Sequence, residues 1–278
     1  MNKFRFKLYT IAASLFLLLS SCNDDFLERS PIVNISDANF WKTANDLELY
    51  TNNFYNRSDL LNSYGDWGSI GPYGLDADNG TDTQVAYNYN TRMNGEATNP
   101  ASGGGWAVND WATLRNINYF MANYNKVDAP WDQVKVYVGE SLFFRSLFYF
   151  GKLKTFGDLP WITSPLDNTS NILYEGRLPR NQVVDSIMLD LDKAIEYLPE
   201  RGPSYTGRIT KEVALLLQAR IALYEGTWEK YHKAKGDKFF DPAVTDEKIK
   251  NYFTVAANAA KEVMDRGVWR IYTTGNMQ

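Results

Sequence analysis

The chain has 278 residues, with 33 acidic and 29 basic side chains and a formal net charge of −4. A mildly acidic net charge argues against nucleic acid as a partner, because binding to phosphates requires clustered Lys and Arg side chains. Aromatic residues make up 15% of the chain, including 18 Tyr and 8 Trp. That content suits a protein that presents rings to a ligand.

The N-terminus has the pattern of an export signal. Three positive side chains precede a 12-residue, largely apolar stretch from Leu8 to Leu19, which is too short to span a bilayer comfortably. Residues 1–21 are therefore predicted to be a signal peptide. Because this leader carries three positive and no negative side chains, its removal changes the net charge from −4 to −7.

Cys22 is predicted to carry a lipid. It is the single cysteine of the chain, so it cannot form an intramolecular disulfide, and it follows two small residues, Ser20 and Ser21. This ending resembles the bacterial lipoprotein cleavage box, in which the thiol is acylated and becomes the mature N-terminus. Two or three acyl chains anchor firmly, since each buried methylene contributes about 0.8 kcal/mol. The alternative is a buried thiol without this role.

Residues 22–42 are expected to form a lipid tether and entry segment, followed by six helices. Apolar spacing and end signals predict the helices at 43–55, 110–126, 131–154, 184–198, 210–224 and 245–267. Thr210 and Thr245 are candidate N-caps, and Gly267 is a C-terminal stop. Long helices with short connections pack in antiparallel fashion, so the predicted fold class is all-α.

The stretch from Ser58 to Asn109 breaks this pattern. Its 52 residues show no helical period and hold 9 of the 19 glycines together with several Tyr and Trp. Loops of this length are usually functional or disordered, and disordered segments are poor in aromatic residues. We therefore expect a long ordered loop that binds ligand.

The residues of this loop suit an oligosaccharide. Covering the apolar face of a sugar ring with an aromatic ring removes roughly 100 Å² from water, worth about 2.5 kcal/mol before ordering costs. Amide, carboxylate and guanidinium groups beside the ring can bond the hydroxyls. The predicted rings are Trp67, Tyr87, Tyr89 and Trp106, and the predicted polar partners are Asp78, Asn88, Arg92 and Asn109. The alternative for each Trp is that it pins the loop to the body.

No cofactor is predicted, and calcium is the alternative. The carboxylates between Asp76 and Asp82 are spaced as in a calcium loop, but Gly80 stands fifth rather than sixth and Tyr87 replaces the twelfth-position Glu. The same acids could form a glycosidase pair with Glu96 or Asp110. Because a helical body offers no obvious deep catalytic barrel, the chain is not expected to be an enzyme.

His232 is the one histidine, so imidazole chemistry depends on it alone. It is expected beyond the fifth helix, among lysines that would repel a metal cation. Nothing nearby is similar to a nucleophile elbow. A solvated helix end is the predicted role.

A series of short motifs resembles one known family. They are Cys22 to Glu28, Arg115 to Asn118, Gly139 to Phe150, Phe156 to Pro160, Arg177 to Arg180, Gly207 to Lys211 and Ala219 to Gly226. Their order over more than 200 residues resembles the SusD/RagB family of outer-membrane nutrient-binding lipoproteins of Bacteroidetes.

The resemblance implies a tetratricopeptide-like helical array that binds oligosaccharide or another nutrient and catalyses nothing. It also implies attachment to the outer membrane through lipid, surface exposure, and a TonB-dependent, SusC-like transporter barrel as partner. The implied domains are a SusD-like N-terminal helical domain at 43–225, with the ligand loop at 58–109, and the start of a truncated C-terminal domain at 226–278. The alternatives are a helical scaffold of an outer-membrane complex and, less favoured, a lipid-anchored glycosidase.

Overall fold

The computed structural model describes residues 40–57, 60–61, 94–96, 104–202 and 207–268. Contacts divide the chain into two compact units, Met1–Lys42 and Thr43–Gln278, and the second holds the helical array. Its helices are α3 (Ala44–Tyr55), η2 (Val108–Trp111), α4 (Ala112–Asn123), η3 (Tyr124–Lys126), α5 (Trp131–Phe156), η4 (Asn171–Tyr174), α6 (Arg180–Tyr197), α7 (Lys211–Lys235) and α8 (Asp246–Asp265).

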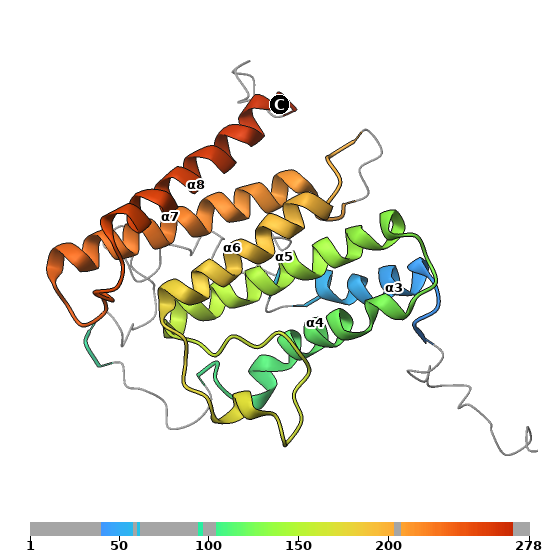
Figure 1. The fold of residues 1–278 in the computed structure, drawn as a ribbon, viewed down its shortest axis with the longest axis horizontal. Coiled ribbons are helices and arrows are strands. Elements are labelled where there is room, and N and C mark those ends of the chain that lie inside the picture. The colour runs from blue at the N-terminus through green and yellow to red at the C-terminus, as the bar shows by residue number, and fades with distance from the viewer. Residues whose placement is uncertain (1–39, 58–59, 62–93, 97–103, 203–206, 269–278) are drawn as a thin grey trace, which may run out of the picture. The chain divides into compact units, whose positions relative to one another are not determined.

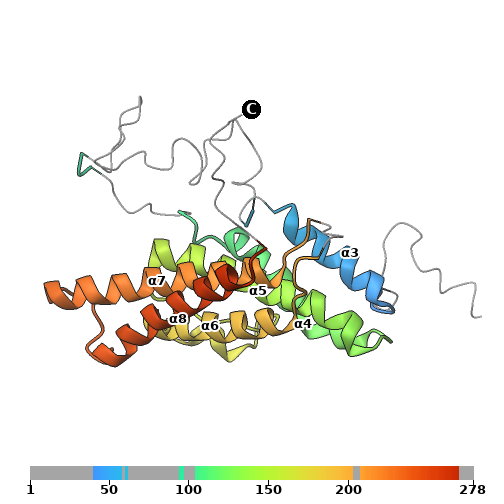
Figure 2. The same cartoon turned by 90° about the horizontal axis from the view of Figure 1, so that it is seen from above.

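From α4 onward, each long helix of this unit packs on the next one along the chain. The most extensive contacts join α7 to α8, α5 to α6 and α6 to α7, while α3 and α4 both pack on α5. Figure 1 shows this succession, from α8 through α7, α6 and α5 to α3 and α4. In the view of Figure 2, α7 and α8 lie at the end of the array opposite α3.

The predicted all-α, tetratricopeptide-like fold class is confirmed. The described residues contain no strand, and their single isolated β-bridge joins Leu159 to Leu178. All six predicted helices are present. Most of the predicted ligand loop at 58–109 lies outside the described residues. Cys22 and residues 22–39 of the predicted tether also lie outside them.

End signals explain where the helices begin and stop. The Thr245 side chain accepts a hydrogen bond from the backbone N–H of Lys248, as expected of an N-cap. α5 ends at Gly157 (φ 73°) and α7 at Gly236 (φ 64°), where the chain enters a region of positive φ that favours glycine.

The predicted end of the fifth helix was wrong. α7 continues to Lys235, so His232 lies inside it, with its Nδ1 2.8 Å from Asp237 Oδ2 and its ring 4.1 Å from that of Trp228. The apolar period fades after Tyr224 because the buried face then carries Glu225 and Glu229 in place of apolar side chains. The predicted domain boundary at 225/226 falls within this helix, and the domain division stays a prediction.

Two glycines allow neighbouring helices to approach closely. A Cβ at Gly226 of α7 would lie 3.2 Å from Tyr252 Cβ and Phe253 Cε1 of α8, and one at Gly139 of α5 would lie 3.1 Å from Leu198 Cγ. Real Cβ atoms are rarely this close to a neighbour, so α7 and α8 would have to separate slightly around an added methyl group.

Gly226→Ala is therefore expected to destabilise the protein by about 1–2 kcal/mol, despite the better helix propensity of alanine. Gly151→Ala in α5 is the matched control, because its Cβ meets nothing within 4 Å, and it should stabilise by about 0.5–1 kcal/mol. Urea unfolding measures both. Equal effects of the two substitutions would show that the α7–α8 contact does not depend on Gly226.

Candidate ligand-binding site

The described end of the predicted ligand loop packs against the C-terminal part of α5. Gly104 (φ 62°) and Gly105 (φ 86°) turn the chain into η2, which leads directly into α4. A Cβ at Gly105 would lie 3.3 Å from Phe156 Cζ, so the absence of a side chain brings the backbone close to α5. Asp110 fixes the start of η2 by accepting the backbone N–H of Ala107 at 2.8 Å.

Trp106 is half-buried in an aromatic cluster. Its ring meets Trp111 edge-on at 5.1 Å and Phe156 at 4.8 Å between centroids, and the Arg177 guanidinium lies 4.3 Å from its centroid. These three partners are those expected of a ring that pins the loop to the body, which was one of its two predicted roles. Contact of Trp106 with ligand stays a prediction.

A groove of about 480 Å³ lies beside this cluster, between the 104–110 segment and α5. Its apolar wall comes from Phe148 and Phe156, and Gly151 leaves open space in the same stretch of α5. Polar side chains complete the lining: Arg57, Asn109, Asp110, Lys152 and Thr155. Aromatic carbon beside amide, carboxylate, hydroxyl and cationic groups is the combination that a hydroxylated ring requires.

Lys152 of α5 links the two sides of the groove. Its Nζ donates to the Gly105 carbonyl at 2.5 Å and lies 5.4 Å from the Trp111 ring and 5.8 Å from the Phe156 ring. The ammonium therefore fixes the loop backbone and also places positive charge over the aromatic faces.

Of the eight predicted ligand-binding residues, the structure describes two. Asn109 is exposed and lines the groove, whereas Trp106 belongs to the neighbouring aromatic cluster. The other six lie outside the described residues: Trp67, Asp78, Tyr87, Asn88, Tyr89 and Arg92. Their roles stay predictions.

The sequence reasoning missed the contribution of α5. Lys152, Thr155 and Phe156 were not predicted as lining residues, and Phe148, which also lines the groove, is otherwise buried in the core. The available signal was a Lys and a Thr among the apolar residues at the end of the helix predicted at 131–154. A helix that is apolar nearly all round leaves such polar positions for its open face.

Several family-like motifs form buried ion pairs that hold the array. Arg208, just before α7, clasps Glu140 of α5 through Nε at 2.7 Å and Nη2 at 2.5 Å, and its Nη1 donates to Asn52 of α3. Tyr55 donates to Glu140 at 2.8 Å. Burial and then the Glu140 charge raise the pKa of Tyr55 well above its usual value, so the phenol remains a donor.

Arg180 makes a second clasp near the α6–α7 contact. Its Nε donates to Glu225 at 2.8 Å and its guanidinium lies 4.0 Å from the Trp228 ring. Glu229 is one turn further along α7 and is only 1% exposed. Burial, and then the nearby Glu225 carboxylate, raise the pKa of Glu229 to about 7. None of these three charged side chains lines the groove.

The described residues contain no group of three His, Cys, Asp or Glu side chains placed to hold a metal ion. The carboxylates between 76 and 82, on which the calcium alternative depends, lie outside this range, and so does that half of the proposed glycosidase pair. Of its other candidates, Glu96 accepts a bond from Asn94 and Asp110 caps η2. None of the described helices is long and apolar enough to cross a membrane.

Comparison with known proteins gives consistent matches. A family model described as "Starch-binding associating with outer membrane" matches residues 109–223. Two SusD-like proteins of Formosa agariphila are each 26% identical, over 78% and 80% of this chain and 43% and 44% of their own lengths. The chain therefore spans less than half the length of these curated relatives.

A solved structure shows the same fold. The chain superposes on a SusD-like carbohydrate-binding protein of Bacteroides fragilis with a TM-score of 0.54 and 14% identity, over 82% of this chain and 41% of that one. The matched family model begins at Asn109, at the groove, and ends in α7, so it covers the central helices. Together with the helical fold, these matches show that the chain is similar to SusD-like proteins.

Proposed function

We propose that the chain binds an oligosaccharide in the groove between the 104–110 segment and α5, without catalysing a reaction. The observation that carries this proposal is the composition of the groove, where Phe148 and Phe156 stand beside Asn109, Asp110 and Thr155. A sugar presents an apolar C–H face and a rim of hydroxyls, and the two kinds of lining match these two surfaces.

The wider role is also a proposal. We infer that Cys22 carries the lipid that holds the protein at the outer membrane, and that bound glycan passes to a TonB-dependent transporter barrel. The leader, the solitary cysteine and the matched family model support this role. Mass spectrometry of the protein from its native cell tests the anchor. An unmodified residue 22 in a soluble cell fraction would contradict it.

Filling the groove should abolish glycan binding without unfolding the protein. Gly151 is exposed in the middle of α5 and a Cβ there meets nothing within 4 Å, so Gly151→Leu adds a side chain to the groove while improving helix propensity. In affinity gels containing a panel of glycans, the wild-type chain should be retarded by at least one of them, and Gly151→Leu should lose that retardation.

Ala257→Leu on the exposed face of α8 is the matched control, because it adds the same side chain far along the array from the groove. It should migrate like the wild type in every gel. Retardation of Gly151→Leu equal to that of the control would show that the glycan does not bind in this groove. No retardation of the wild type by any glycan would count against carbohydrate binding by this chain.

A further inference from the structure

α7 carries an unusual line of exposed apolar side chains. On the other long helices such side chains occur singly, as with Leu49 on α3, Leu189 on α6 and Met264 on α8, and isolated cases are normal. On α7, Leu216, Leu223 and Tyr231 are 51%, 54% and 58% exposed. A run of this kind on one element requires a separate explanation.

The three residues lie on one face of the helix. Steps of seven and eight residues are each about two helical turns, so Leu216, Leu223 and Tyr231 share one broad face and follow it for about 22 Å. The opposite face of α7 is buried and includes Ile221 and Glu225. The line is therefore the outer face of a helix whose inner face already packs on α6 and α8.

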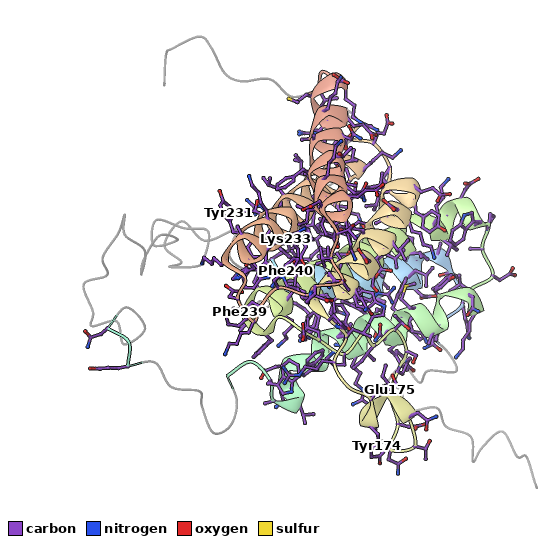
Figure 3. All side chains as sticks on the ribbon, turned by 60° about the vertical axis from the view of Figure 1, so that its left-hand side comes forward. Tyr174, Glu175, Tyr231, Lys233, Phe239 and Phe240 are labelled. Atoms are coloured by element: carbon purple, nitrogen blue, oxygen red, sulfur yellow. The ribbon has the colours of Figure 1, made fainter. Side chains whose placement is uncertain are left out.

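The line continues past the end of the helix. Phe239, in the turn between α7 and α8, is 57% exposed, and its ring lies 5.6 Å from that of His232. An open, mainly apolar groove of about 570 Å³ follows the same face from Arg220 to His232. Figure 3 shows Tyr231, Phe239 and Phe240 together along one side of the molecule, with Tyr174 well separated from them.

Positive charge is concentrated at this end of α7. Residues 230–238 contain Lys230, Lys233, Lys235 and Lys238 with Asp237 as their one acid, in a chain whose net charge is −4. The ammonium groups lie beside the rings: Lys230 is 5.6 Å from the Tyr231 centroid, Lys233 is 5.9 Å from that of Phe240, and Lys238 is 5.3 Å from that of Phe239. Lys233 also pairs with Asp246 at 2.7 Å.

We propose that the outer face of α7 and the following turn bind an anionic lipid surface. Leu223, Tyr231 and Phe239 enter the boundary between headgroups and acyl chains, and the neighbouring lysines meet lipid phosphates. An apolar line on one helix face with lysines beside it is the arrangement of interfacial helices. The line is long and open along one element, which suits an extended surface better than a small enclosed ligand. It shares no lining residue with the groove on α5.

Vesicle sedimentation tests this proposal, using the chain without residues 1–22 so that no acyl anchor contributes. We expect binding to phosphatidylcholine vesicles that contain phosphatidylglycerol, weakening as salt is raised, and little binding to phosphatidylcholine alone. The triple variant Leu223→Ser, Tyr231→Ser, Phe239→Ser should reduce the partition coefficient at least tenfold. Lys235→Gln should reduce it by up to fivefold, and Lys238→Gln similarly.

Two matched controls remove exposed apolar side chains elsewhere. Tyr174→Ser and Leu189→Ser, at residues 84% and 65% exposed, should bind vesicles like the parent chain. Circular dichroism of each variant establishes that it is folded. Equal binding of the triple variant and the parent, or no preference for anionic vesicles, would overturn the proposal. Retardation of the parent by an anionic polysaccharide gel, lost in the triple variant, would instead assign the surface to a glycan and equally overturn it.

Discussion

Replacing Arg145 by Leu is expected to lower the free energy of unfolding by about 3–5 kcal/mol. Arg145 of α5 donates to Asp190 of α6 through Nε and Nη2, both at 2.6 Å, and the two side chains are only 7% and 10% exposed. The substitution leaves the Asp190 carboxylate buried without its countercharge. Loss of that compensation, more than loss of the contact itself, accounts for the expected size of the effect.

The double variant Arg145→Leu, Asp190→Leu separates these contributions. It removes both charges, so it should recover much of the stability that Arg145→Leu loses, because buried apolar pairs often replace buried ion pairs at little cost. Urea unfolding of the wild type, both single variants and the double variant completes a double-mutant cycle, which gives the interaction free energy of the pair. A single substitution costing less than about 1 kcal/mol would show that the pair is better solvated than its burial indicates.

Glu229→Gln is expected to stabilise the protein at alkaline pH by about 3 kcal/mol and to have little effect near pH 4. Burial, and then Glu225, raise the pKa of Glu229 to about 7 in the folded protein, from an ordinary value of 4.5. Between these values the folded state binds more protons than the unfolded state. The stability of the wild type therefore falls as pH rises from about 4.5 to 7 and levels off above that range.

The surroundings of Glu229 support this sign. Arg180 opposes the rise in the pKa of Glu229 but already pairs with Glu225, while the Asp241 carboxylate adds to it. Glu225 Oε1 and Glu229 Oε2 are both buried without a hydrogen-bond donor among the described residues. One proton held by this pair of carboxyl groups removes a buried negative charge and supplies a donor.

Thermal unfolding of the wild type and Glu229→Gln between pH 4 and 8 measures the difference. Glu247→Gln, at an exposed position of α8, should track the wild type throughout. A constant difference between Glu229→Gln and the wild type across this range would mean that Glu229 is already ionised in the folded protein at pH 5.

Much of the fold could be predicted from the sequence because most helices bury an apolar stripe. The stripe of α8 (Ile249, Ala256 and Val263) is buried as expected, and the caps at Thr245 and Gly267 locate its ends. The end of α7 could not be predicted in this way. Its later turns bury Glu225 and Glu229 beside Arg180, and expose Tyr231, which inverts the usual pattern.

The site was predictable only in part, for a related reason. Loop composition identified Asn109, which lines the groove, but a groove between a loop and a helix depends on a contact distant in sequence. The Lys152–Gly105 bond joins residues 47 positions apart, and nothing local to either one indicates it. The ion pairs Arg145–Asp190 and Arg208–Glu140 likewise join residues far apart in the sequence, and only the folded chain reveals their pairing.

Hydrogen–deuterium exchange of the full chain, with and without a glycan that retards it in gels, tests the central claim most directly. Residues 104–111 border the groove in a loop and a short 3₁₀ helix, so their backbone amides should exchange more slowly when ligand is bound. We expect protection there and unchanged exchange in α8. Protection confined to other helices, with 104–111 unaffected, would contradict a ligand site in this groove.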